Sequence, residues 1–360
     1  MQKQIRSSSL DIIRGVACIM VLVYHLNSCK PVGLGQAGME IFFTLSGFLI
    51  TKSLVESINK NGIEGFKKFA KRRLSRLIPA LLIYLLVCSP LIIALSFTNY
   101  SRALIGSVFS LIGFFNIYQI YFDTNAASYP GFGGLWSLSL EEQFYILSAG
   151  FYYFQFKKKC KINGMDILNL AIALITLSIT FRILGLSNLK DFNSVIRNSY
   201  LPHTRFLGFG FGVLTYYIIT LKLKQVGGNV IYSIISIALI AILVESVSQY
   251  SNKAILFQWS IIPILTSIII YQNINLDKII QFLDSGNSVL LMNLNHCFKA
   301  VKLIGLSSYS IYLWHCLFTQ LMHYYFPKPS LLIWASCGFI SLITGFISWH
   351  YIEKKCYVFN

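Results

Sequence analysis

The first long apolar stretch, residues 10–27, contains two side chains that could do chemistry, Arg14 and His25. In an α-helix, eleven residues rise about 16 Å and complete three turns plus about 20°. Both side chains would therefore lie on one face, with His25 deeper than Arg14. Histidine suits proton transfer near neutral pH, and a charged side chain at depth usually lines a polar cavity. Asp11 could instead pair with Arg14, which leaves a structural interpretation of this helix open.

A second candidate lies in the basic stretch 66–81, which contains Arg72, Arg73 and Arg76. Guanidinium groups match the geometry of phosphates, so the cluster predicts a phosphate-binding patch at the cytoplasmic end of a helix. An ordinary positively charged membrane anchor is the alternative. Pro79, shortly after the cluster, favours a helix that begins close to it.

Ionisable residues also lie inside three later apolar stretches. Glu141 follows an apolar helix start, where a carboxylate is costly without a polar partner; a structural ion pair is the alternative to a catalytic role. Arg205 precedes a glycine-rich run and indicates either a polar interior or close helix packing. His315 lies inside another apolar stretch, where a hydrogen-bonded packing histidine is the simpler interpretation.

Several other kinds of site are not indicated. Residues 33–38 match GxGxxG, but no strand precedes them, so a short turn is favoured over a dinucleotide site. The eight cysteines form no CxxC pair, and no metal-ligand cluster is present in the sequence, so we expect no metal.

The composition identifies the elements that must position these residues. The 360-residue chain is 55% hydrophobic and 12% charged, about half the charged fraction of a soluble domain. With a mean hydropathy of +0.63, it is expected to be an all-α polytopic membrane protein. The net charge of +17 fits lysines and arginines in cytoplasmic loops, and we expect no nucleic-acid partner.

Charge also predicts the orientation of the apolar segments. If 103–121 does not cross the membrane, 21 basic residues lie on the cytoplasmic side and 6 outside; if it crosses, the division is 14 to 13. The first arrangement obeys the positive-inside rule. We therefore expect about ten transmembrane helices, both termini cytoplasmic, and a re-entrant or partial segment around 103–134. The eleven segments are 8–29, 39–57, 77–97, 103–121, 135–156, 165–185, 199–221, 229–249, 255–271, 303–325 and 331–352. The longest hydrophilic gap is 272–302.

Together, these motifs resemble the acyltransferase type 3 family of bacterial inner-membrane O-acyltransferases. The resemblance runs from end to end, and the order and spacing of the motifs carry it. They are Arg14 and His25 in the first helix, Glu40 before paired phenylalanines, the RxxR of Arg73 and Arg76, Trp136 to Tyr145 around Glu141, Arg205, Tyr309 to His315, and Ile352 with Glu353. Lys355 stands where the family usually has proline, a departure that concerns the C-terminal end and not the chemistry.

The resemblance implies transfer of an acyl group, usually acetyl, from acetyl-coenzyme A to a hydroxyl of an envelope polysaccharide such as lipopolysaccharide O-antigen or capsule. Residues 1–360 would form a single transmembrane acyltransferase domain of the inner membrane, with no appended soluble domain. The acceptor would be a glycan or a lipid-linked sugar.

The candidate residues fit such a reaction. His25 would take the hydroxyl proton or carry the acyl group, Arg14 would steady developing negative charge, and Glu141 would orient His25 or a water. The donor phosphates would bind Arg72, Arg73 and Arg76. Glu353 is expected to cap the last helix or to pair with a neighbouring lysine.

Two other classes of function stay open. In a proton-coupled transporter, Arg14, Glu141 and His315 would form a proton relay, although the sequence shows no related halves. In an acyl-binding protein without turnover, the same residues would only hold the ligand.

Overall fold

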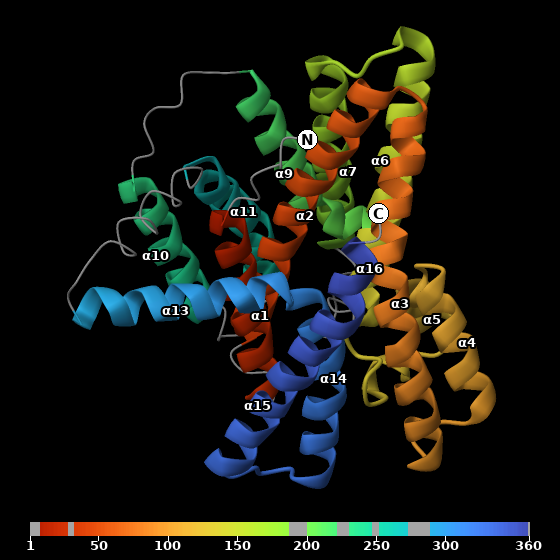
Figure 1. Ribbon diagram of the computed structural model, residues 1–360, viewed down its shortest axis with the longest axis vertical. Helices are drawn as coiled ribbons and strands as arrows, with labels where there is room; N and C mark the ends of the chain where they lie inside the picture. Colours follow the sequence, from red (N-terminus) through yellow and green to blue (C-terminus); the bar gives the residue numbers. More distant parts are fainter. Residues whose placement is uncertain are drawn as a thin grey trace.

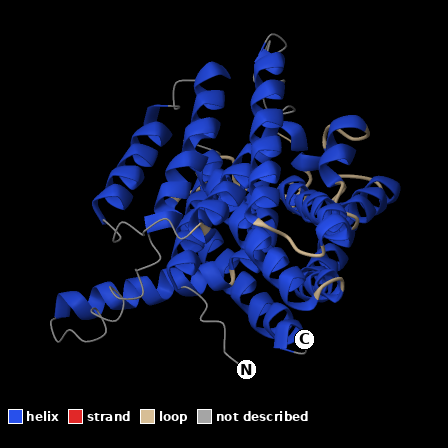
Figure 2. Cartoon of the chain, turned by 90° about the horizontal axis from the view of Figure 1, so that it is seen from above, coloured by secondary structure: helices blue, strands red, loops and turns tan. Residues whose placement is uncertain are grey.

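The computed structural model describes residues 8–27, 32–186, 200–221, 230–246, 252–272 and 289–358. Within these ranges the chain is helical and contains no strand (Figure 2). The helices are α1 (Ser8–Leu26), α2 (Val32–Asn61), α3 (Glu64–Ala94), α4 (Tyr100–Leu111), α5 (Phe115–Tyr121), η1 (Ala126–Ser128), α6 (Leu135–Lys159), α7 (Gly164–Leu186), α9 (Pro202–Thr220), α10 (Val230–Ser246), α11 (Asn252–Gln272), α13 (Val289–Leu306), α14 (Ser308–Tyr325), α15 (Leu331–Ser348), η3 (Trp349–Glu353) and α16 (Lys354–Val358).

The helices have the lengths and composition of a membrane-integral protein. Among the described residues, five are long and apolar enough to cross a bilayer: Ser8–Leu26, Gly33–Asn61, Glu64–Ala94, Gly164–Gly185 and Leu331–Cys356. The expected all-α membrane class is confirmed. The expected count of about ten crossings and the cytoplasmic placement of both termini stay predictions.

Helix α3 is continuous through the basic cluster. It begins at Glu64 and contains Pro79 and Pro90, so the prediction that a helix begins close to Pro79 is wrong. Membrane helices tolerate an internal proline because neighbouring helices and local adjustments satisfy the freed backbone groups. As a result, Arg73 and Arg76 lie three residues apart on one helix and can face the same neighbours.

The segment expected to be partial or re-entrant consists of short pieces. Helices α4 and α5 have 12 and 7 residues and are joined at Gly113, whose φ is +76°. Their lengths of about 18 Å and about 10 Å fall short of a hydrocarbon core of about 30 Å. Both lie beside the lower half of α3 in Figure 1. This geometry fits a segment that does not cross the bilayer.

Helix α13 occupies part of the predicted hydrophilic gap 272–302 and lies across the direction of α14 and α15 (Figure 1). The apolar segments expected from the sequence do not include residues 289–302 of this helix. Helix α13 crosses α1 through two glycines: a Cβ at Gly305 would overlap the carbonyl of Asp11, and one at Gly15 would overlap the carbonyl of Val301. The two backbones therefore touch directly.

Helices α2 and α9 pack closely at the centre of the molecule. A Cβ at Gly212 would overlap the carbonyl oxygen of Thr44, so the glycine-rich run serves close packing, as one interpretation of the sequence predicted. The rings of Phe43 and Phe144 stack on Phe209, with centroids 5.0 and 4.6 Å away. These contacts join α2, α6 and α9 into a frame that holds one side of the site.

Candidate functional site

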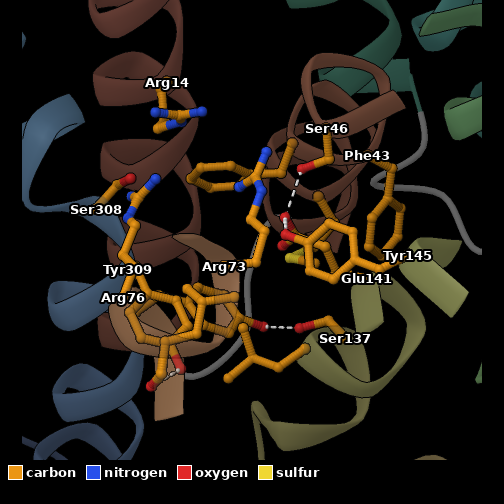
Figure 3. A pocket seen from close by; sticks show the side chains of 15 residues that line it. Arg14, Phe43, Ser46, Arg73, Arg76, Ser137, Glu141, Tyr145, Ser308 and Tyr309 are labelled. Carbon is orange, nitrogen blue, oxygen red and sulfur yellow. Dashed lines mark hydrogen bonds between the residues drawn. The ribbon is translucent and has the colours of Figure 1, made fainter. Parts of the chain in front are cut away.

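A pocket lies where α1, α2, α3, α6 and α14 meet (Figure 3). Its walls combine three arginines, one glutamate, three tyrosines and three serines with apolar side chains. The lining residues are Arg14, Met39, Phe42, Phe43, Ser46, Arg73, Arg76, Leu77, Ser137, Leu138, Glu141, Tyr145, Ser308, Tyr309 and Tyr312. The structure therefore brings together four of the predicted site residues from three helices: Arg14, Arg73, Arg76 and Glu141.

Glu141 is held by two hydroxyl groups. Its Oε1 accepts a hydrogen bond from Ser46 Oγ at 3.0 Å and a short one from the hydroxyl of Tyr145. Tyr145 lies one helical turn after Glu141 on α6, whereas Ser46 comes from α2. The carboxylate is thus kept at a fixed place in the pocket wall, which meets the requirement that a carboxylate in a membrane span has polar partners.

Arg73 and Arg76 face the pocket in different ways. The Arg73 guanidinium lies over the Tyr145 ring, 5.1 Å from its centroid, and 5.8 Å from the centroid of Phe69. Arg76 Nε donates to Oε1 of Glu353 at 2.6 Å, while Ser310 donates to the other oxygen of that carboxylate. The expectation that Glu353 caps a helix or pairs with a neighbouring lysine is therefore wrong, because its partner is Arg76, 277 positions away.

The other two predicted arginines, Arg14 and Arg72, differ in whether they line the pocket. Arg14 lines the pocket from α1, and its Nη1 lies 3.8 Å from Asp11 Oδ1, so the local pair expected from the sequence forms alongside the pocket role. Arg72 is absent from the pocket wall. It lies one helical turn before Arg76 on α3, and its role in donor binding stays a prediction.

His25 lies just beyond the pocket, next to α14. Its ring centroid is 5.0 Å from that of His315, and the His315 ring is 5.2 Å from the ring of Tyr312, which lines the pocket. Ser308, Tyr312 and His315 share one face of α14, because residues four and seven apart project on the same side. This face leads from Arg14, near Ser308, to His25.

Glu141 was expected to orient His25 or a water, and the structure shows no direct hydrogen bond between Glu141 and His25. The hydrogen bonds of the Glu141 carboxylate go to Ser46 and Tyr145, and those of the His25 ring go to the carbonyl oxygen of Val21 and to His315. Glu141 belongs to the pocket nevertheless, and its catalytic role stays a prediction.

Two polar pairs near the pocket were not found from the sequence. Ser137 Oγ and the hydroxyl of Tyr312, both in the wall, are 2.6 Å apart. Behind Phe43, the fully buried Arg205 forms an ion pair with Glu40 and lies over the ring of Trp259, 4.1 Å from its centroid. Each of these residues except Trp259 belongs to a motif noted above, but no sequence signal says that the two members of a pair meet.

The pocket presents cations to an anionic ligand, and an imidazole lies beyond its Tyr312 wall. In a comparison with known proteins, the sequence model of a family described as "Acyltransferase domain" matches residues 7–350. The chain belongs to this acyltransferase family. The predicted resemblance is confirmed. No metal-binding group of histidine, cysteine or carboxylate residues occurs in the described part of this domain.

Some relatives of this acyltransferase are similar to nearly the whole chain, and others to only part of it. A Staphylococcus aureus strain COL protein with an O-acetyltransferase name is 28% identical over 362 residues, covering 96% of this chain and 56% of the relative. The peptidoglycan O-acetyltransferase OatA of Listeria monocytogenes is 37% identical over 150 residues, covering 40% and 24% of the two chains. The O-acetyltransferase OatA of Staphylococcus aureus strain NCTC 8325 is 36% identical over 143 residues, or 38% and 23%.

The acyltransferase chain spans about half the length of the staphylococcal relative that it matches throughout. No solved structure matches it.

Proposed function

We propose that this acyltransferase moves an acetyl group from acetyl-coenzyme A to a sugar hydroxyl of a cell-envelope glycan, at the inner membrane of a bacterium. The observation that carries the proposal is the convergence of Arg14, Arg73 and Arg76 on one pocket whose far side leads to His25. Coenzyme A carries several phosphates, and guanidinium groups bind phosphates by two parallel hydrogen bonds. The residues present therefore fit this donor.

The arginines would divide the work of holding the donor. Within the described residues, Arg73 contacts rings and forms no ion pair, so its guanidinium nitrogens are available for a phosphate. Arg76 is partly neutralised by Glu353 and contributes less net charge. Arg14 lies on the α1 face that runs toward His25, about 16 Å before it, where it would bind a charged part of the donor.

The reaction needs a base at the end of this route. In the direct path, His25 takes the proton of the acceptor hydroxyl while the hydroxyl oxygen attacks the thioester carbonyl, and the sulfur leaves as thiolate. In the relay path, His25 accepts the acetyl group first and passes it to the hydroxyl. Rapid denaturation at neutral pH after incubation with radiolabelled acetyl-coenzyme A distinguishes them, because only the relay path leaves label on His25 and an acylated imidazole is lost in acid.

The acceptor is proposed as a class, an envelope sugar bearing a free hydroxyl. Lipopolysaccharide O-antigen and capsule are the acceptors that the sequence resemblance implies. The name of the Listeria relative adds peptidoglycan, which that protein acetylates by its name. Each glycan can be isolated separately, so the acceptor is open to direct test.

The test in the cell is to delete the gene and compare ester-linked acetyl groups on each glycan by NMR. The proposal predicts the loss of one ester signal, its return with the wild-type gene, and no return with His25→Ala at equal membrane abundance. An unchanged set of esters on all three glycans would contradict it.

A further inference from the structure

His315 occupies a buried position in which both ring nitrogens have partners. Its Nδ1 lies 2.7 Å from the carbonyl oxygen of Tyr312 and 3.3 Å from that of Ile311. Its Nε2 lies 3.1 Å from Nδ1 of His25 and 3.5 Å from Sγ of Cys316. The residue is 1% exposed, so these groups, rather than bulk water, determine where its hydrogen resides.

The partners determine the hydrogen positions on both rings. A carbonyl oxygen only accepts, so Nδ1 of His315 carries a hydrogen, and in the neutral ring Nε2 holds the lone pair. Nδ1 of His25 lies near two acceptors: this lone pair on His315 and the carbonyl oxygen of Val21, which is 3.0 Å away. Nδ1 of His25 therefore carries a hydrogen, and its Nε2 is the nitrogen with a lone pair. A second hydrogen on Nε2 of His315 would oppose the N–H of His25.

We propose that His315 is a positioning residue that holds His25 in the tautomer with hydrogen on Nδ1 and the lone pair on Nε2. The inference rests on the proposed function and names the atom that reacts. The O–H bond of the acceptor breaks and its proton binds Nε2 of His25, while the hydroxyl oxygen bonds to the thioester carbonyl carbon. The C–S bond breaks, and the departing sulfur takes the proton from Nε2. Throughout the reaction, Nε2 of His315 accepts a hydrogen bond from the Nδ1–H group of His25.

A positioning role of His315 differs from a packing role because only the positioning role depends on the lone pair on its Nε2. His315→Phe keeps an aromatic ring in the buried space but removes the acceptor. His315→Gln offers an amide oxygen at about the reach of Nε2 and keeps the acceptor. His350→Phe is the matched control, because His350 is exposed on η3 and belongs to no part of the site.

Nitrogen NMR of purified protein labelled with 15N-histidine tests the tautomer without any turnover. Signals of His25 and His315 are assigned by their absence in His25→Ala and His315→Gln. The wild-type protein should show a protonated Nδ1 and an unprotonated Nε2 on His25. His315→Phe should show a larger share of the other tautomer, because only the carbonyl oxygen of Val21 then accepts from Nδ1. A wild-type His25 with its hydrogen on Nε2 would overturn the inference, whatever the acetylation assay gives.

Steady-state kinetics measure how the loss of the His315 acceptor affects acetyl transfer. We expect His315→Phe to lower kcat by about 10- to 100-fold, part of the range that proton-transfer catalysis contributes, without a change in KM for acetyl-coenzyme A. His315→Gln should recover most of the activity, and His350→Phe should match the wild type.

Folding is checked by size-exclusion profile and thermal unfolding in detergent. Full activity in folded His315→Phe would overturn the inference, as would a folded His315→Gln that is as inactive as the phenylalanine variant. If His315→Phe fails to fold, the glutamine variant and the wild-type NMR spectrum decide. Absence of transfer by the wild-type protein would instead count against the proposed function, and the tautomer would still be read from the NMR spectrum.

Discussion

At the scale of single residues, the arginines in and near the pocket differ in their partners. Arg205 is fully buried against Glu40, and Arg76 is tied to Glu353, whose side chain is 3% exposed. Arg73 lies in the wall against rings. The charge of an arginine therefore does not show whether it binds the donor. The groups that the arginine already contacts are the better guide.

Arg73→Gln tests this assignment. The substitution removes a cation from the pocket without leaving a buried carboxylate unpaired, so the fold should be kept. Loss of one charge-assisted hydrogen bond, about 1.5–3 kcal/mol, should raise KM for acetyl-coenzyme A by about 10- to 100-fold. Lys71→Gln, at an exposed position on the same helix, is the control and should leave KM unchanged. Equal KM values for the two variants would refute the role of Arg73.

Arg76→Gln should behave differently, because it leaves the buried carboxylate of Glu353 without its cation. Breaking one side of a buried ion pair costs about 3–5 kcal/mol, so we expect a clear drop in the midpoint of thermal unfolding. The measurement is unfolding in detergent, followed by tryptophan fluorescence. A wild-type midpoint would show that Arg76 is not needed for stability and that the ion pair with Glu353 is weak.

The sequence predicted which residue types the site uses but not their partners. Arg14, Arg73 and Glu141 were identified because charged side chains are costly in apolar stretches, and all three line the pocket. The pairs of Arg76 with Glu353 and of Arg205 with Glu40 join positions 277 and 165 residues apart. Such pairs depend on how helices are arranged, and one sequence carries no local signal for that arrangement.

At the scale of elements, apolar runs predicted the existence of most helices well. Their ends and interruptions were less predictable: α3 begins well before its apolar part, and α4 and α5 divide one apparent span. Helix α13 was missed because polar and basic residues interrupt its apolar ones, whereas Gly305 of α13 and Gly15 of α1 let the two helices dock. Hydropathy measures the preference for an apolar environment, so it cannot report docking that depends on backbone contact.

Gly212→Ala tests the importance of close approach between α2 and α9. The added methyl group would overlap the backbone of Thr44, so the helices would have to separate, and overpacking of this kind costs about 1–3 kcal/mol. Gly150→Ala in α6 is the matched control, because nothing lies within 4 Å of its added Cβ. That variant should be as stable as the wild type or up to about 1 kcal/mol more stable, because alanine favours a helix.

The two glycine variants are compared by thermal unfolding in the same detergent. A lower midpoint for Gly212→Ala and an equal or higher one for Gly150→Ala would agree with the packing described. Equal midpoints in both would mean that α2 and α9 have room to move apart, and that the frame around Phe43 and Phe209 is looser than the structure indicates.

At the scale of the whole molecule, the orientation in the membrane depends on charge and on α4 and α5 not crossing. The end of α6 at Lys159 and the turn between α14 and α15 lie at opposite ends of the molecule in Figure 1. The segment that follows residues 165–185 and includes Asn188 is expected on the outer side, but it lies outside the described residues. The exposed Lys328 in the α14–α15 turn is therefore used as the marker of the outer side.

Single cysteines at these two positions test the orientation in a cysteine-free background. With an impermeant maleimide on intact cells, Lys328→Cys should react and Lys159→Cys should react only after the membrane is opened, because lysine-rich loops stay cytoplasmic. Reaction of Lys159→Cys but not of Lys328→Cys in intact cells would contradict the arrangement in which residues 103–134 do not cross.

The central claim is that one pocket holds acetyl-coenzyme A by its arginines and presents the thioester to His25. The most direct measurement is acetyl transfer by the purified protein in lipid nanodiscs, with labelled acetyl-coenzyme A and isolated envelope glycan. Wild-type protein should release free coenzyme A and form labelled ester on the glycan. Folded His25→Ala should bind the donor but fall by about 10²- to 10⁴-fold in transfer, the usual contribution of a positioned base. Wild-type transfer rates in folded His25→Ala would contradict the account.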